Sequence, residues 1–298
     1  GVDLMCLPNC RIYNMNNAGS MWKGEGRYDF SALDNVVYET LQGAPDALLM
    51  LMLDADPPTW WLNAHPDSVI YVKNSKNVYE KKISYASKEW REDVGKFYEA
   101  FLEYAMNQPW SGHVYSVKIS AGATFEWQYY GHAYSATEPT CADTSRVATT
   151  EFRAWLKNKY ETVEALRKAW GNNTVTFETA NVPTFDERKP TTYNTLLDGK
   201  TQRNVLDVHY FLCDMVTDSI LYLAKVVKET TGNQWVVGTY NGYLTNVLTW
   251  EGAGLANASI SRVLESEYID FLCAPVCYDE RNIGMSASYM MMVDSVIA

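Results

Sequence analysis

One apolar stretch and the polar residues after it decide the fold: Ala47-Leu48-Leu49-Met50-Leu51-Met52-Leu53, followed by Asp54-Ala55-Asp56-Pro57-Pro58. A continuous apolar run bounded by acids and prolines is typical of a parallel strand that is covered on both faces. Outward from this stretch, strand-like and helix-like segments alternate along the whole chain. Repeated strand–helix units imply a parallel sheet, and right-handed crossovers make that sheet either doubly wound or a barrel.

The expected elements form five strand–helix units without a break in composition. The strands are expected at residues 2–8, 47–53, 114–119, 235–238 and 269–275, and the helices at residues 31–41, 87–106, 150–160, 163–170, 205–230 and 259–264. Ser31 is the expected N-cap of the first helix, Gly171 the residue that ends the fourth, and the stretch between residues 53 and 87 a long loop. We therefore expect one domain over residues 1–298.

The polar residues at the strand ends favour a barrel. Each predicted strand is followed by charged, amide or aromatic side chains: Asn9 and Arg11, Asp54 and Asp56, Glu126 and Trp127, Tyr240 and Asn241, and Tyr278 and Asp279. In a barrel these ends converge on one rim, where the loops after the strands build the site. No glycine-rich phosphate loop follows the first strand, which counts against a nucleotide-binding doubly wound sheet. The predicted fold class is α/β, a (β/α)8 TIM barrel.

Composition narrows the class of partner. The chain has 36 acidic and 25 basic side chains, a formal charge of −11, which argues against nucleic acid and anionic membrane surfaces. The longest apolar run, residues 47–53, is far shorter than the ~20 residues that span a bilayer. Aromatic residues make up 13% of the chain, which leans toward a carbohydrate ligand. The six cysteines have no metal-ligand spacing, so we expect buried free thiols and no metal.

Glu126 is the strongest catalytic candidate. Small residues precede it, which lets a ligand approach the backbone, and Phe125 and Trp127 flank it. Aromatic neighbours desolvate a carboxylic acid and raise its pKa, as a general acid at neutral pH requires. A solvated loop glutamate explains the same residues equally well.

The other candidates are substrate contacts. Asp54 and Asp56 fit binding of sugar hydroxyls, with Trp60 as an aromatic platform, although both acids could instead cap the next turn. Trp127, Tyr240, Asn241 and Tyr278 could also contact substrate, or the tyrosines could orient a nucleophile. Tyrosine at a strand end is equally common as packing.

Three segments resemble one known family. Tyr28-Asp29-Phe30-Ser31-Ala32-Leu33-Asp34 is similar to the YDFSxLD run of glycoside hydrolase family 42, the β-galactosidase-like enzymes. Asp56-Pro57-Pro58-Thr59-Trp60-Trp61-Leu62, with His65-Pro66, is similar to its APPAWL…HP run. The segment from Phe152 to Gly171 resembles its FRxWLxxKYxxxxALNxAWG run, which is specific to the group.

This resemblance implies a (β/α)8 barrel and a retaining, double-displacement hydrolysis of β-linked sugars without a cofactor. Among these sugars, β-galactosides are the expected substrates. Glu126 then corresponds to the acid/base glutamate after strand 4, although the family usually has Asn where this chain has Phe125. The chain would supply strands 2 to 6, with residues 132–234 as a long insertion between strands 4 and 5. Strand 1 would lie upstream of Gly1, and strands 7 and 8, with the nucleophile, beyond Ala298.

Alternatives remain open at this point. If the strand numbering is wrong, Glu251 or Glu280 could be the nucleophile. An endo-acting β-glycanase and a carbohydrate-binding barrel without activity fit the same residues. The sequence leaves the oligomeric state and the compartment open.

Overall fold

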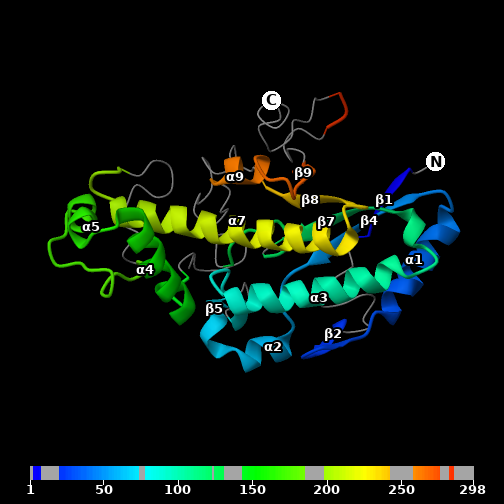
Figure 1. The fold of residues 1–298 in the computed structure, drawn as a ribbon, viewed down its shortest axis with the longest axis horizontal. Coiled ribbons are helices and arrows are strands. Elements are labelled where there is room, and N and C mark those ends of the chain that lie inside the picture. Colours follow the sequence, from blue (N-terminus) through cyan, green and yellow to red (C-terminus); the bar gives the residue numbers. More distant parts are fainter. Residues whose placement is uncertain are drawn as a thin grey trace.

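A parallel sheet forms the centre of the molecule. The computed structural model describes residues 3–7, 20–73, 78–122, 124–130, 143–184, 198–241, 258–275 and 282–284. The sheet has the order β1 (Leu4–Leu7), β4 (Leu48–Asp54), β7 (Val114–Ser120), β8 (Val236–Tyr240) and β9 (Phe271–Cys273), and every neighbouring pair is parallel (Figure 1). This confirms the five predicted strands and their order. Because all five run the same way, their carboxyl ends share one edge.

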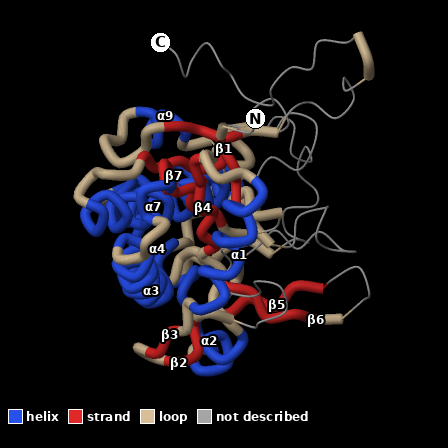
Figure 2. The backbone as a smooth tube through the Cα atoms, turned by 90° about the vertical axis from the view of Figure 1, so that its right-hand side faces the viewer, coloured by secondary structure: helices blue, strands red, loops and turns tan. Residues whose placement is uncertain are grey.

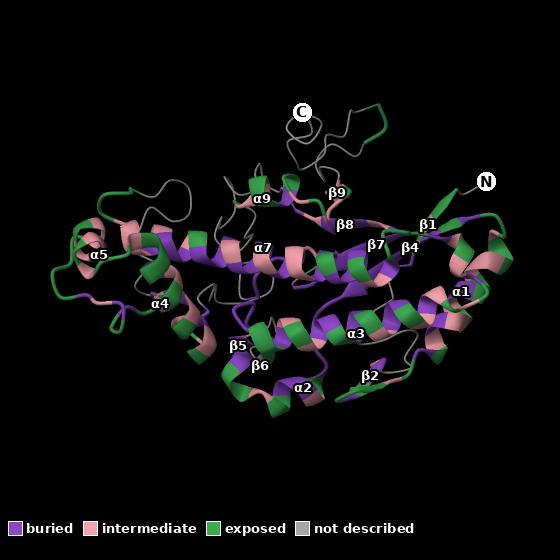
Figure 3. Cartoon of the chain, in the orientation of Figure 1, coloured by how far each residue is buried: buried purple, intermediate pink, exposed green. Residues whose placement is uncertain are grey.

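The sheet is open within the described residues. β1 and β9 each pair with one neighbour, so the ring does not close there. Five consecutive parallel strands joined through helices are the observed part of the predicted (β/α)8 barrel. Helices α3 (Lys88–Met106) and α7 (Arg203–Thr231) pack side by side and cover one face of the sheet, as Figures 1 and 3 show.

Alternate side chains of the strands differ in their surroundings. Leu49, Leu51 and Leu53 of β4 are fully buried, as are Val117 and Ile119 of β7. These positions belong to the apolar core that α3 and α7 complete. The intervening positions point to the opposite face, which in a closed barrel is the interior.

The ends of the helices follow their caps. Ser87 caps α3, because its hydroxyl accepts a hydrogen bond from the amide of Trp90 (3.1 Å). The prediction that Ser31 caps α1 (Ser31–Gly43) is wrong. Phe30 occupies the cap position, and the amide and hydroxyl of Ser31 donate to the Asp29 carboxylate (3.2 and 2.7 Å).

The helices between β7 and β8 also follow local hydrogen bonds. α4 (Arg146–Tyr160) begins four residues earlier than predicted because Ser145 accepts a hydrogen bond from the amide of Ala148 (3.2 Å). α5 (Val163–Trp170) has the predicted bounds, and Gly171 ends it in the left-handed conformation (φ 59°). A short helix, α9 (Ile260–Leu264), precedes β9.

The prediction of a long loop between residues 53 and 87 is wrong, because this stretch has regular secondary structure. It contains α2 (Thr59–Ala64), a 3-10 turn (Pro66–Ser68) and an antiparallel hairpin of β5 (Val69–Lys73) and β6 (Tyr79–Ile83), which extends beside the sheet in Figure 2. A second small hairpin joins β2 (Trp22–Gly24) and β3 (Arg27–Tyr28), and another 3-10 turn (Ser111–His113) precedes β7. Elements this short give little periodicity in a sequence.

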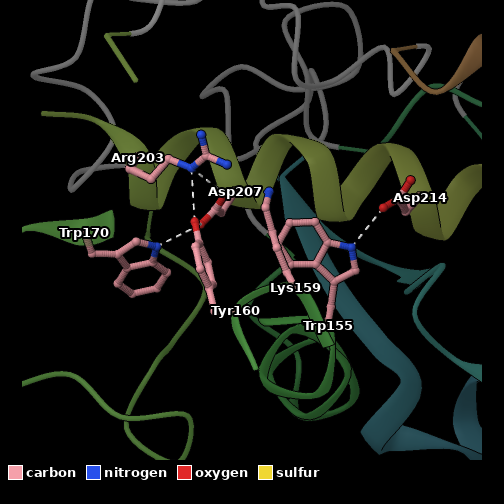
Figure 4. Close-up of polar contacts among 7 residues, drawn as sticks. All are labelled: Trp155, Lys159, Tyr160, Trp170, Arg203, Asp207 and Asp214. Carbon is pink, nitrogen blue, oxygen red and sulfur yellow. Dashed lines mark hydrogen bonds and ion pairs between the residues drawn. The ribbon is translucent and has the colours of Figure 1, made fainter. Parts of the chain in front are cut away.

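A buried carboxylate fastens α4 and α5 to α7. Asp207 is fully buried and accepts hydrogen bonds from Lys159 Nζ (2.9 Å), Tyr160 Oη (2.6 Å), Trp170 Nε1 (2.8 Å) and Arg203 Nε (3.0 Å), as Figure 4 shows in part. These donors come from three helices. A buried carboxylate with two cationic and two neutral donors is fully compensated.

The described cysteines are unpaired: Cys213 is buried, Cys273 is half-buried and Cys6 is exposed. The expectation of free thiols is confirmed for these three, whereas burial is wrong for Cys6, which lies on the terminal strand β1. No helix among the described residues has the length and apolar character that a membrane span requires.

We expect Asp207→Asn to lower the free energy of unfolding by about 3 kcal/mol, because it leaves Lys159 and Arg203 beside a buried group without charge. Urea denaturation measures the change. Asp46→Asn, an exposed site near the start of β4, is the control and should change stability by less than about 0.5 kcal/mol. Equal effects of the two substitutions would contradict the assigned role of Asp207.

Candidate active site

A cavity opens at the carboxyl ends of β4 and β7. It has a volume of about 600 Å³. Its wall includes Asp54 at the end of β4, Asp56 just beyond it, Gly122 and Phe125 after β7, and residues 80–83 of β6. The two strand ends are joined by a hydrogen bond from the amide of Ala55 to the carbonyl of Ser120 (2.7 Å). The cavity therefore lies where the loops of a parallel barrel form a binding site.

Asp54 and Asp56 are 2% and 9% exposed, and their carboxylates accept hydrogen bonds from different parts of the chain. The Asp54 carboxylate accepts a hydrogen bond from the amide of Asp56 (3.1 Å), which fixes the turn that leaves β4. The Asp56 carboxylate contacts the neighbouring strand end: the amide of Gly122 donates to both of its oxygens (3.3 Å each), and the Tyr130 hydroxyl donates to Oδ2.

Burial dominates the electrostatics of this cluster of Asp56, Gly122 and Tyr130. It raises the pKa of Asp56 above its usual range, although the hydrogen bonds from Tyr130 and Gly122 and the charge of Lys82 act in the opposite direction. Burial, together with the charge of Asp56, also holds the pKa of Tyr130 well above its ordinary value. Tyr130 therefore remains a neutral donor at neutral pH.

The segment after β7 has an unusual backbone. Gly122 has a φ of 81°, and the non-glycine residues Thr124, Phe125 and Trp127 have φ values of 61°, 65° and 61°. L-residues rarely adopt this region, and such conformations persist only where the surroundings enforce them. Asp56 supplies part of this enforcement, because it holds Gly122 at one end of the segment and Tyr130 at the other.

Glu126 lies within this strained segment, six residues after the last residue of β7. It is half-buried, and its carboxylate accepts hydrogen bonds from Thr124 Oγ1 and Gln128 Nε2 (2.9 Å each). Its neighbours Thr124 and Phe125 line the cavity. The predicted strand ends at residue 119, and the structure likewise places Glu126 in the loop that follows β7.

The predicted platform Trp60 and the predicted contact Trp127 are not among the residues that line the cavity. Trp60 Nε1 donates to the carbonyl of Trp22 (2.9 Å), and the two indoles meet edge to face at 5.3 Å. Trp127 is fully buried, with its ring centroid 5.8 Å from that of Tyr85. In the structure both tryptophans are packing residues.

The end of β8 carries two more predicted residues. The Tyr240 hydroxyl accepts a hydrogen bond from Lys118 Nζ (3.1 Å), and that ammonium lies 4.3 Å from the centre of the Tyr240 ring. Asn241 is fully buried, and neither polar atom of its side chain has a hydrogen-bond partner among the described residues. Tyr278, Glu251 and Glu280 lie outside the described residues.

Sequence reasoning missed Tyr130 and Lys118, and it noted Gly122 only as one of the small residues before Glu126. Lys118 gave a signal, because it is the one charged residue in an otherwise apolar and small-residue strand. Burial alone would lower the pKa of Lys118. The hydrogen bond to Tyr240 and the nearby groups together raise that pKa by more, so it lies above its ordinary value. Tyr130 gave none, since a tyrosine beside Tyr129 has no distinctive spacing. No cluster of His, Cys, Asp or Glu within the described ranges could hold a metal ion.

We expect Gly122→Ala to destabilise the protein by about 2 kcal/mol or more, because an L-residue at this φ is strained. A Cβ there would lie 2.4 Å from the Tyr85 hydroxyl oxygen and 2.5 Å from the Gln128 carbonyl oxygen. Thermal unfolding measures the effect. Gly112→Ala is the matched control, since its Cβ meets no atom within 4 Å. A Gly122→Ala protein as stable as this control would refute the close packing.

Asp56 should also give the protein a pH-dependent stability. Its folded pKa is raised, so the folded state holds this proton more tightly than the unfolded chain, whose Asp pKa is about 3.9. The contribution of Asp56 to stability is therefore lost as pH rises from about 4 through the folded pKa. We expect Asp56→Asn to flatten this fall in denaturation curves recorded across pH. Parallel profiles for the two proteins would contradict the raised pKa.

Known proteins that resemble this chain indicate its family. The family model of glycoside hydrolase family 42, described as β-galactosidase, matches residues 10–258. The curated relatives include the β-galactosidase BbgII of Bifidobacterium bifidum, 28% identical over 67% of this chain and 26% of its own length. Another is the β-galactosidase BgaA of Clostridium cellulovorans, 25% identical over 75% of this chain and 30% of its own.

Solved structures show the same fold. The β-galactosidase of Bacillus circulans sp. alkalophilus superposes with a TM-score of 0.56 and 17% identity, over 82% of this chain and 34% of that one. The catalytic domain of a β-amylase from Paenibacillus polymyxa gives a TM-score of 0.62 at 13% identity, over 86% and 64%. This chain thus spans about a third or less of the β-galactosidases it matches. The family match covers most of its residues, and the chain belongs to glycoside hydrolase family 42.

Proposed function

We propose that the protein to which this chain belongs is a retaining glycoside hydrolase that cleaves β-linked galactosides. The family match over residues 10–258 carries this proposal. The curated relatives reported above are β-galactosidases, which favours this activity over an endo-acting β-glycanase or an inactive carbohydrate-binding barrel. The chain spans about a third or less of those relatives, so the proposal concerns the full-length protein.

The cavity at the ends of β4 and β7 is the proposed place of the sugar. Carboxylates are strong acceptors for sugar hydroxyl groups, and both Asp54 and Asp56 line this cavity. Asp56 already accepts hydrogen bonds from Gly122 and Tyr130. We propose that Asp54, the carboxylate that lines the cavity at the end of β4, contacts a sugar hydroxyl, and that Asp56 chiefly fixes the loop that carries Glu126.

In the proposed reaction Glu126 acts twice. It protonates the glycosidic oxygen while a second carboxylate attacks the anomeric carbon, so the carbon–oxygen bond breaks and a glycosyl-enzyme forms. Glu126 then takes a proton from water, which attacks the same carbon and releases the sugar. The nucleophile is not assigned among the described residues. This chemistry requires no metal or organic cofactor.

Some of the remaining predicted residues stay proposed substrate contacts, whereas the two tryptophans receive a supporting role. Tyr240 and Asn241 stay proposed substrate contacts at the end of β8, with Lys118 orienting the Tyr240 hydroxyl. The buried indole of Trp127 supports the loop, and Trp60 supports the start of α2. Tyr278 stays a proposed contact on the basis of the sequence alone. The substrate itself is proposed to be a glycoside or an oligosaccharide.

Glu126→Gln in the full-length protein tests the assignment. We expect it to slow hydrolysis of an alkyl β-galactoside by about 10²–10⁴-fold, because the leaving alkoxide then receives no proton. An aryl β-galactoside with a very acidic leaving group should show a much smaller loss in its first step. Rates for the two substrates, measured side by side, separate a lost acid from a misfolded protein.

The control is Glu25→Gln, an exposed glutamate in the turn between β2 and β3. It should hydrolyse both substrates like the unsubstituted protein. Unchanged turnover of the alkyl galactoside by Glu126→Gln would remove Glu126 from the mechanism.

A further inference from the structure

A second depression lies on the surface of α4 and α7. It has a volume of about 580 Å³ and is lined by Trp155, Asn158 and Lys159 of α4 and by Arg203, Tyr210 and Asp214 of α7. It shares no lining residue with the cavity at the strand ends. Figure 4 shows how Trp155, Lys159 and Arg203 lie along the same stretch of α7.

The cations of this depression are held in place from beneath. Lys159 Nζ and Arg203 Nε both donate to the buried carboxylate of Asp207. The Lys159 ammonium also lies 4.3 Å from the ring centre of Trp155 and 4.8 Å from that of Tyr210. Because these side chains are already ordered, a ligand that binds them loses little side-chain entropy.

The charges around the depression are unevenly distributed, with the positive excess beside Arg203. One carboxylate, Asp207, serves two cations, Lys159 and Arg203. The second carboxylate, Asp214, accepts from the Trp155 indole and shares Arg262 with Asp218, whose carboxylate lies closer to that guanidinium (2.6 Å against 3.3 Å). One positive charge is therefore left over at the end of the depression formed by Lys159 and Arg203, and one negative charge at the end formed by Asp214.

Arg203 offers the donors for an anion. Its Nε is occupied by Asp207 and Tyr160, while neither terminal amino group has a hydrogen-bond partner in the described part of the chain. The side chain is 28% exposed, so these groups can reach a ligand. A guanidinium binds carboxylate or sulfate oxygens in pairs, with defined geometry.

The aromatic residues indicate what carries the anion. Tyr210 is 43% exposed and Trp155 is half-buried at the wall. Aromatic faces beside a few fixed polar groups suit the C–H face of a sugar ring. The exposed amide of Asn158 adds hydrogen-bond capacity for a hydroxyl group.

We propose that this depression is an accessory binding site for an acidic saccharide, in which Arg203 and Lys159 bind a carboxylate or sulfate group and Tyr210 contacts the sugar ring. The choice of a saccharide rests on the proposed function, whereas the preference for an anion rests on the residues alone. The site binds a charged unit of the carbohydrate away from the reaction centre.

Calorimetric titration of the full-length protein with galactose, galactose 6-sulfate, galacturonate and inorganic sulfate tests the proposal. We expect at least one acidic sugar to bind about tenfold or more tightly than galactose, because a charge-assisted hydrogen bond is added. Tighter binding of the sulfate ester or of the uronate identifies the anion. Inorganic sulfate should bind more weakly than the preferred sugar, since it lacks the ring that meets Tyr210.

Variants locate the binding. Arg203→Met and Tyr210→Ala should each weaken acidic-sugar binding by about tenfold. Tyr210→Ala keeps the Asp207 hydrogen bonds, so it tests the site even if Arg203→Met does not fold. Lys157→Met, an exposed lysine on α4 that does not line the depression, is the matched control and should bind normally.

Hydrolysis of a small neutral galactoside is measured in parallel. If both variants hydrolyse it normally but lose acidic-sugar binding, the accessory site is established. If the unsubstituted protein does not hydrolyse galactosides but binds acidic sugars through Arg203 and Tyr210, only the proposed function fails. The accessory site is refuted if acidic sugars bind no better than galactose, or if both variants bind them like the unsubstituted protein.

Discussion

The buried carboxylate of Asp56 is the contact on which the candidate site depends. It follows β4, yet its hydrogen-bond donors are Gly122 and Tyr130, which flank the segment after β7. Three non-glycine residues of that segment have positive φ values, and Glu126 lies between two of them. One carboxylate thus joins two strand ends and maintains a strained loop. These donors offset part of the cost of burying Asp56, whose pKa stays raised by burial.

A second buried carboxylate has a comparable role in another part of the fold. Asp207 gathers side chains of α4, α5 and α7, and α7 in turn covers the sheet. Asp56 orders a loop at the strand ends, whereas Asp207 orders helices and leaves two cations facing a surface depression. In both places an acid that has little contact with solvent determines which groups remain available for a ligand.

Much of the fold could be predicted from the sequence. β4 and β7 were found as apolar runs bounded by polar residues. The apolar residues of α3 repeat at helical spacing over enough residues to give a clear period. The β5–β6 hairpin and α2 could not be predicted, because these elements are short and depend on tertiary contacts. The cap of α1 was assigned to Ser31, but the side chain of Asp29 accepts hydrogen bonds from that residue.

The site was predicted less completely. Asp54 and Asp56 line one cavity, as their place after a strand indicated. Trp60 was predicted as an aromatic platform and Trp127 as a substrate contact, but Trp60 packs against Trp22 and the Trp127 indole is fully buried, since sequence does not show which way a ring points. Tyr130 and Gly122 act through contacts between residues 66 and 74 positions apart, which no local pattern reveals.

The stereochemistry of cleavage distinguishes a retaining from an inverting enzyme. Proton NMR of the full-length protein acting on an aryl β-galactoside records which anomer of galactose forms first, before mutarotation. A covalent glycosyl-enzyme requires two inversions at the anomeric carbon, so the account predicts the β-anomer. Initial release of the α-anomer, or no galactose at all, would contradict a retaining β-galactosidase.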